Sequence, residues 1–204
     1  MDEVVAMSGY DEARIAGVVG SLGREARTAF AAACAERIWP LVERYASAVS
    51  LPIRDRQVLR DALDTVWGVA NGAGSDEDLR LAQEAAEALV PFEGDGWMLE
   101  SGYAQNGIAA IAYAARTWLS DNPQEAVWAA CQVYEVADYA AQQNQASMAR
   151  VFSAEVEAEL ADAPVVQASI RGIFDDLAAA GRDSAEAVRR RASDAADAFV
   201  KHFP

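Results

Sequence analysis

The sequence offers few of the side chains that catalysis by proton transfer or covalent attack requires. His202 is its only histidine, two positions before the last residue given. A serine or cysteine nucleophile needs a base held rigidly beside it, and residues near a chain end are usually poorly ordered. The position of His202 therefore argues against a Ser–His–Asp or Cys–His site. We expect a protein that is not an enzyme.

Metal ligation has equally little support in the sequence. Cys34 and Cys131 are far apart, and with one histidine they do not make a Cys/His zinc site. The Glu-x-x-His motif of ferritin-like di-iron bundles is absent. Two acidic pairs have a spacing of three: Glu84 with Glu87, and Glu135 with Asp138. Acids are so frequent that such pairs arise by chance, so we expect no metal and no cofactor, and both cysteines reduced, buried and not bonded to each other.

Two further short patterns indicate local structure more than chemistry. The run at residues 94–96, Gly-Asp-Gly, lacks the preceding strand and the following Gly-Lys-Ser/Thr of a phosphate loop, so it predicts a turn. The three arginines at 189–191 fan over most of a helical turn. We expect them to pair with acidic neighbours.

Charge excludes some classes of partner. The formal net charge is −15 at pH 7. Nucleic acids and anionic membrane surfaces are bound chiefly through Lys and Arg, so both are disfavoured. No apolar run approaches the ~20 residues of a membrane span, and the first residues lack the basic start of a signal peptide. We expect a cytoplasmic protein, of a bacterial type.

Helical periodicity runs through almost the whole chain, and alternating strand-like sequence is nearly absent. Alanine, the best intrinsic helix former, is the most frequent residue. Two apolar faces at helical spacing stand out: Phe30, Cys34, Ile38, Leu41 and Tyr45, and then Leu59, Ala62, Leu63, Val66 and Ala70. The sequence predicts a compact all-α bundle of about seven to eight helices, with no significant sheet, in a single domain over residues 1–204.

Caps and breakers predict where these helices begin and end. Ser75 precedes three acids, and Asn122 precedes Pro123, so each is typical of an N-cap. Asp183 repeats the pattern and should open the last helix. Pro40 should bend or break the helix that contains it, because it removes one backbone hydrogen bond.

Residues 91–106 form the one sizeable irregular segment that the sequence predicts. It is the expected boundary of a two-layer division within the domain. Phe92, Trp97 and Tyr103 make it the candidate contact loop, since long loops in compact domains are often functional.

A resemblance to a known family appears between residues 29 and 67. Ala-Phe at 29–30, Glu-Arg-Ile-Trp-Pro at 36–40 and Leu-Asp-Thr-Val-Trp at 63–67 resemble the YjaG-like family of uncharacterised bacterial proteins. The resemblance implies an all-α fold and cytoplasmic residence. It marks six residues: Glu36, Arg37, Trp39, Pro40, Asp64 and Trp67. Ala109 stands where relatives carry an acid, which weakens any role that depends on that acid.

The marked residues also suggest a structural interpretation. Arg37 lies just before Pro40, and Asp64 lies in the next predicted helix. Consecutive helices are usually neighbours, so a guanidinium could fork onto the carboxylate and hold the bend. We expect a buried Arg37–Asp64 pair.

Three functions compete at this point. The leading hypothesis is a non-enzymatic protein-interaction module that binds a protein partner or itself as a homodimer. The first alternative is an immunity-type protein that neutralises a basic toxin, because acidic charge would steer that encounter. The second alternative is a small-ligand binder or metal-dependent enzyme that uses carboxylates near residues 91–106.

Overall fold

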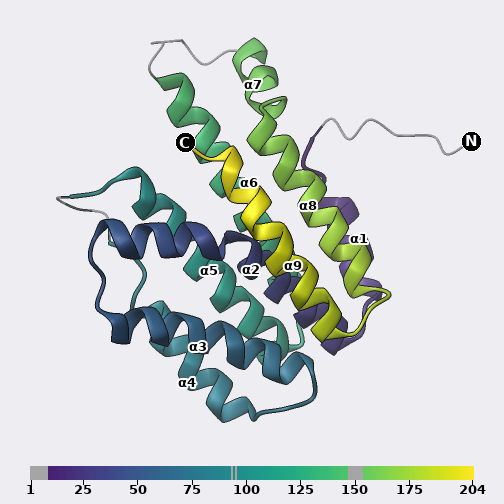
Figure 1. Cartoon of the computed structure of the whole chain (residues 1–204). Helices are drawn as coiled ribbons and strands as arrows, with labels where there is room; N and C mark the ends of the chain where they lie inside the picture. Colours follow the sequence, from purple (N-terminus) through teal and green to yellow (C-terminus); the bar gives the residue numbers. More distant parts are fainter. Residues whose placement is uncertain (1–8, 93, 95, 147–153) are drawn as a thin grey trace, which may run out of the picture.

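Helices account for all the regular structure in the described part of the chain. The computed structural model describes residues 9–92, 94, 96–146 and 154–204. Within these ranges there are nine α-helices, one 3₁₀ turn and no strand, which confirms the all-α prediction and exceeds the expected number of helices by one (Figure 1). The bounds are α1 Glu12–Ser21, α2 Arg24–Ala48, α3 Ile53–Ala70, α4 Asp76–Glu87, α5 Leu99–Ser120, α6 Pro123–Ala146, α7 Ala154–Ala161, α8 Pro164–Ala180, α9 Ala185–Phe199 and η1 Val200–His202.

Two of the three predicted helix starts are confirmed. The Ser75 hydroxyl accepts a hydrogen bond from the amide of Asp78 at the start of α4. Asn122 accepts one from the amide of Gln124 at the start of α6. The third start is wrong by one residue, because Ser184 and not Asp183 caps α9.

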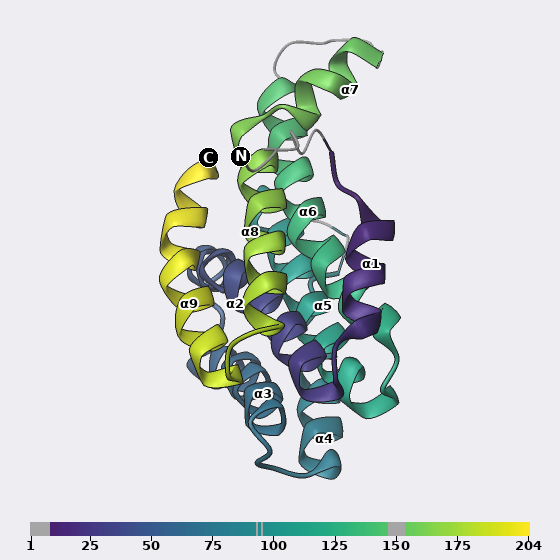
Figure 2. The same cartoon turned by 90° about the vertical axis from the view of Figure 1, so that its right-hand side faces the viewer.

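Helix α2 is the central element of the bundle. It packs against α5, α9, α6, α3 and α8, and Figure 2 shows it enclosed by them. Every residue from 27 to 38 is buried, so α2 has no solvent-exposed face along this stretch. The predicted apolar face is buried except at Tyr45, which is half-buried. Small alanine side chains allow neighbouring helices to approach α2 from all sides.

Pro40 does not break α2. The helix continues for eight residues beyond Pro40, to Ala48. Of the two predicted outcomes, a bend or a break, the break is therefore wrong. The missing hydrogen bond is offset by packing, because Leu41 and Val42 directly after the proline are both buried in the core.

Close contact between α2 and α5 depends on a glycine. A β-carbon at Gly107 would lie 2.3 Å from Cγ2 of Val42 and 3.1 Å from Cγ2 of Ile38. Any larger residue at position 107 would force the two helices apart.

The predicted irregular segment is shorter than expected. Helix α5 begins at Leu99, so only residues 88–98 connect α4 to α5. Tyr103 is fully buried in α5 and cannot belong to an exposed contact loop, which corrects that prediction. Phe92 is 92% exposed, and Trp97 is half-buried.

One continuous hydrophobic core takes residues from α1 through to Phe203. In the described part of the chain, no helix combines the length and the apolar character that crossing a bilayer requires.

Candidate functional site

Glu36 and Arg37, neighbours on α2, serve two separate polar networks. Both oxygens of Glu36 accept hydrogen bonds from Arg60, at 2.9 and 3.0 Å. The indole Nε1 of Trp67 donates a third, at 3.0 Å. The buried carboxylate is therefore satisfied by α3 alone, which fixes α3 against α2.

Asp64 completes this first network instead of binding Arg37. It accepts hydrogen bonds from Arg60, at 2.7 and 3.1 Å, and another from Arg189 of α9. Arg60 also lies over the ring of Trp39, 5.1 Å from its centroid. Burial alone would raise the pKa of Asp64, but Arg60 and then Arg189 outweigh it and lower the pKa.

Arg37 forms the second network with α8. Its Nε and Nη2 donate to the two carboxylate oxygens of Asp176, at 2.9 and 2.8 Å. Nη2 also donates to the carbonyl of Gly172, at 3.3 Å. The side chains of Arg37 and Asp176 are only 7% and 1% exposed. The predicted Arg37–Asp64 pair is wrong, because α8 and not α3 supplies the carboxylate.

The Arg37 guanidinium lies against a glycine on α8. A β-carbon at Gly172 would lie 2.7 Å from Cζ and 2.9 Å from Nη1 of Arg37. The ring of Phe199 is the next neighbour, with its centroid 5.9 Å from Cζ. The small residue is what allows the planar group to lie flat on the helix.

Opposing effects act on the ionisation of this pair. Burial alone would lower the pKa of Arg37, but the nearby Asp176 raises it, so the guanidinium stays charged. Burial raises the pKa of Asp176, and Arg37 opposes that rise. Both carboxylate oxygens accept N–H donors, which favours the ionised form at neutral pH.

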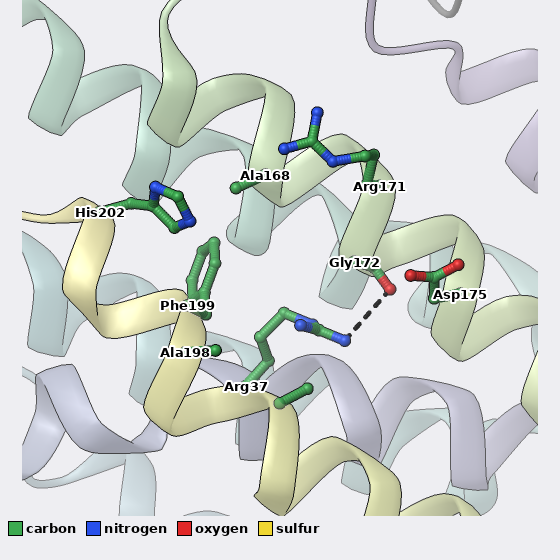
Figure 3. A pocket seen from close by; sticks show the side chains of 9 residues that line it. Arg37, Ala168, Arg171, Gly172, Asp175, Ala198, Phe199 and His202 are labelled. Atoms are coloured by element: carbon green, nitrogen blue, oxygen red, sulfur yellow. Dashed lines mark hydrogen bonds between the residues drawn. The ribbon is translucent and has the colours of Figure 1, made fainter.

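A shallow hollow of about 210 Å³ opens beside Arg37, between α2, α8, α9 and η1. We call it the α8–α9 hollow. Figure 3 shows Arg171 and His202 on either side of Ala168, with Phe199 between His202 and Arg37. Its lining residues are Arg37, Ala168, Arg171, Gly172, Asp175, Ala195, Ala198, Phe199 and His202.

Arg171 is the exposed cationic group of this hollow. Its guanidinium makes no hydrogen bond or ion pair with the described residues, whereas Arg37 keeps one nitrogen, Nη1, without such a partner. Asp175 is exposed and is the one acid among the lining residues. The arrangement can bind a small group with several acceptor oxygens.

The other predicted features have local structural roles. Each of the three arginines at 189–191 forms an ion pair, as expected. The partners are Asp64 for Arg189, Glu186 for Arg190 and Asp183 for Arg191. The amide of Trp97 donates to the carbonyl of Gly94, which confirms a turn there.

The residues of the two acidic pairs contact separate partners. Glu87 binds Arg116, Glu135 contacts Cys131, and Asp138 accepts from Gln142. No group of three potential metal ligands occurs among the described residues, from which Glu93 and Asp95 are excluded. Within residues 91–106, Glu100 pairs with Arg44, and the carboxylate-based alternative stays a prediction.

Both cysteines are free, and Cys34 is buried as expected. Cys131 is only half-buried, which corrects the expectation of full burial. It faces Glu135, and its Sγ lies 3.4 Å from a carboxylate oxygen of that residue.

Sequence reasoning missed the α8 half of the site: Arg171, Gly172, Asp175 and Asp176. One signal was available. Asp176 interrupts an otherwise apolar helical face with Ile173 and Leu177, and an acid at such a position predicts a buried cationic partner.

Comparison with known proteins gives the family. Residues 15–190 match the family described as "Protein of unknown function (DUF416)", and the chain belongs to this family. The fold is similar to the crystal structure of a DUF416 family protein from Shewanella baltica, with a TM-score of 0.73 and 13% sequence identity over 88% of this chain and 93% of that chain. At this identity the likeness concerns the fold alone. No curated protein matches the chain. The expectation of an uncharacterised protein family is thereby confirmed.

Proposed function

We propose that this protein is a non-enzymatic protein-interaction module whose partner docks over the α8–α9 hollow. The observation that carries the proposal is the exposed Arg171, which has no partner in the described chain, next to the buried Arg37. By contrast, the three arginines of α9 all pair with acids of the same chain. In a chain of net charge −15, two guanidinium groups at one hollow offer a local site for an acidic group.

The proposal includes the wider setting of the protein. We place it in the cytoplasm of a bacterium, as a single domain over residues 1–204. We also propose that the resemblance to the YjaG-like proteins and the DUF416 match describe the same family. Self-association through this face, giving a homodimer, is one form of the interaction.

The test is capture of partners from a lysate of the source organism. Full-length wild-type protein and Arg171→Glu are used as baits, and Arg182→Glu is the matched control. Arg182 is also exposed, and it does not line the hollow. A partner retained by wild type and Arg182→Glu but lost with Arg171→Glu supports the proposal. Equal recovery with all three baits contradicts it. Light scattering of the purified protein tests the homodimer.

Phe92→Ser tests the candidate contact loop in the same experiment. Phe92 is 92% exposed, so its replacement should leave the fold intact. If Phe92→Ser loses the partner and Arg171→Glu keeps it, residues 88–98 and not the hollow form the docking surface.

An immunity-type role is the second candidate, and the net charge of −15 favours it. A basic toxin would be attracted by the whole acidic surface and not by one hollow. Its capture would survive Arg171→Glu and would weaken steeply with added salt.

A further inference from the structure

We propose that the α8–α9 hollow binds an oxyanion, a carboxylate or phosphate group, between Arg37 and Arg171. This inference rests on the proposed docking function and names the chemistry of the bound group. Arg37 and Arg171 line the same hollow from different helices, α2 and α8. Figure 3 shows the Arg171 side chain reaching toward Ala168 and the Arg37 guanidinium beside Gly172.

The Arg37 guanidinium is held in place before any ligand arrives. Nε and Nη2 donate hydrogen bonds to the carboxylate of Asp176, and Nη2 also donates to the carbonyl of Gly172. The side chain of Arg37 is only 7% exposed. Only Nη1 lacks a partner among the described residues. Because the plane of the group is fixed, an anion that binds Nη1 need not order this side chain, which lowers the entropic cost of binding.

Arg171 supplies the second set of donors. It is exposed and unpaired within the described chain, so it can fork onto two oxygens of the ligand without breaking an existing ion pair. His202 lines the opposite wall and adds an imidazole N–H donor. The buried ring of Phe199 and the alanines of α9 provide the apolar floor.

Two nearby acids set the strength of this site. Asp176 neutralises Arg37 but does not line the hollow. Asp175 does line it and opposes an anion there. The site therefore depends on directed hydrogen bonds more than on net positive charge, and removing the charge of Asp175 should strengthen binding.

Nuclear magnetic resonance of the arginine side chains tests this inference on the full-length protein. The Nε–H group of Arg37 is bonded to Asp176, which slows its exchange with water and makes it a reporter. We expect its signal to shift and saturate as inorganic phosphate or succinate is added, at an ionic strength held constant with sodium chloride. Arg171→Gln should weaken the binding about 10-fold, the usual effect of losing a charge-assisted hydrogen bond. Arg182→Gln should leave it unchanged, and Asp175→Asn should strengthen it roughly two- to threefold.

A second arm distinguishes the source of the oxyanion. The same titration is made with a glutamate-containing peptide whose ends are blocked. Saturable, Arg171-dependent binding of the free anions indicates a small molecule, and binding of the peptide alone indicates a carboxylate of a partner protein. Both outcomes support an oxyanion site. Shifts that never saturate, or equal affinities in wild type and Arg171→Gln, overturn it. Partner capture that depends on Arg171 would leave the docking proposal standing even then.

Discussion

Asp176 of α8 accepts two hydrogen bonds from Arg37 of α2, a residue 139 positions earlier in the sequence. Both side chains are almost completely buried. The pair joins the central helix α2 to α8, and it holds the Arg37 guanidinium beside the α8–α9 hollow.

The first prediction concerns the energetic coupling of this pair. Arg37→Ala or Asp176→Ala should each lower the free energy of unfolding by about 3–5 kcal/mol, because either leaves one buried charge unpaired. The double mutant should lose much less than the sum. Urea unfolding of the four proteins gives the coupling energy. Arg37→Ala with Asp64→Ala is the matched pair and should be additive; strong coupling there would mean that the two networks are not separate.

The second prediction concerns the glycine under Arg37. Gly172→Ala should destabilise the protein by about 1–3 kcal/mol, because the new β-carbon would overlap the guanidinium. Gly17→Ala is the control, and its expected effect on the free energy of unfolding is the opposite. Gly17 lies within α1 and no atom is near the added carbon, so the substitution should stabilise the protein by up to about 1 kcal/mol. Thermal unfolding of both variants measures the difference. A neutral Gly172→Ala would show that Arg37 can move away without cost.

The third prediction is a pH dependence from Asp64. Its pKa is lowered in the folded protein, so its contribution to stability is present above the unfolded value of about 4 and is lost as pH falls through the folded pKa. The difference in unfolding free energy between wild type and Asp64→Asn should stay constant from pH 8 to pH 5 and shrink below about pH 4. Asp61→Asn, which removes an exposed acid hydrogen-bonded to Gln57, is the matched control.

The fourth prediction is that neither thiol reacts readily in the folded protein. Complete burial raises the pKa of Cys34, and burial together with Glu135 raises the pKa of Cys131 to about 12. At pH 8 the thiolate fraction of Cys131 should be roughly 10³-fold below that of a free cysteine. A disulfide exchange reagent should therefore label both thiols only after unfolding. Rapid labelling of the native protein, or a change in gel mobility on reduction, would contradict this prediction.

Much of the fold was predictable because helix formation is local. The periodic faces around Phe30 and Leu59 are buried as expected, and the caps at Ser75 and Asn122 begin helices. The start of α5 was not predictable by the same reasoning. Glycines near position 102 are typical of a loop, yet a β-carbon there would lie 2.5 Å from Cε1 of Tyr139. Gly102 is needed for packing between helices, which only the tertiary structure reveals.

The site was predictable only in part. The motif at residues 36–40 drew attention to Arg37, and the structure places this residue in a buried ion pair with Asp176. The predicted partner, Asp64, was wrong because it was chosen from the helix that follows next in the sequence. An acid 139 positions away cannot be selected from one sequence when 32 Asp and Glu residues compete for the role.

The central position of α2 has a consequence for biosynthesis. Residues 24–48 leave the ribosome before any of the five helices that will pack against them, and α9 follows more than a hundred residues later. At ~5–20 residues per second, the apolar surface of α2 stays uncovered for roughly 7–30 seconds before α9 is made. The nascent chain should therefore be sensitive to aggregation or dependent on a chaperone until α9 is made. A premature stop before residue 185 should yield insoluble protein even though most of the helices have been synthesised.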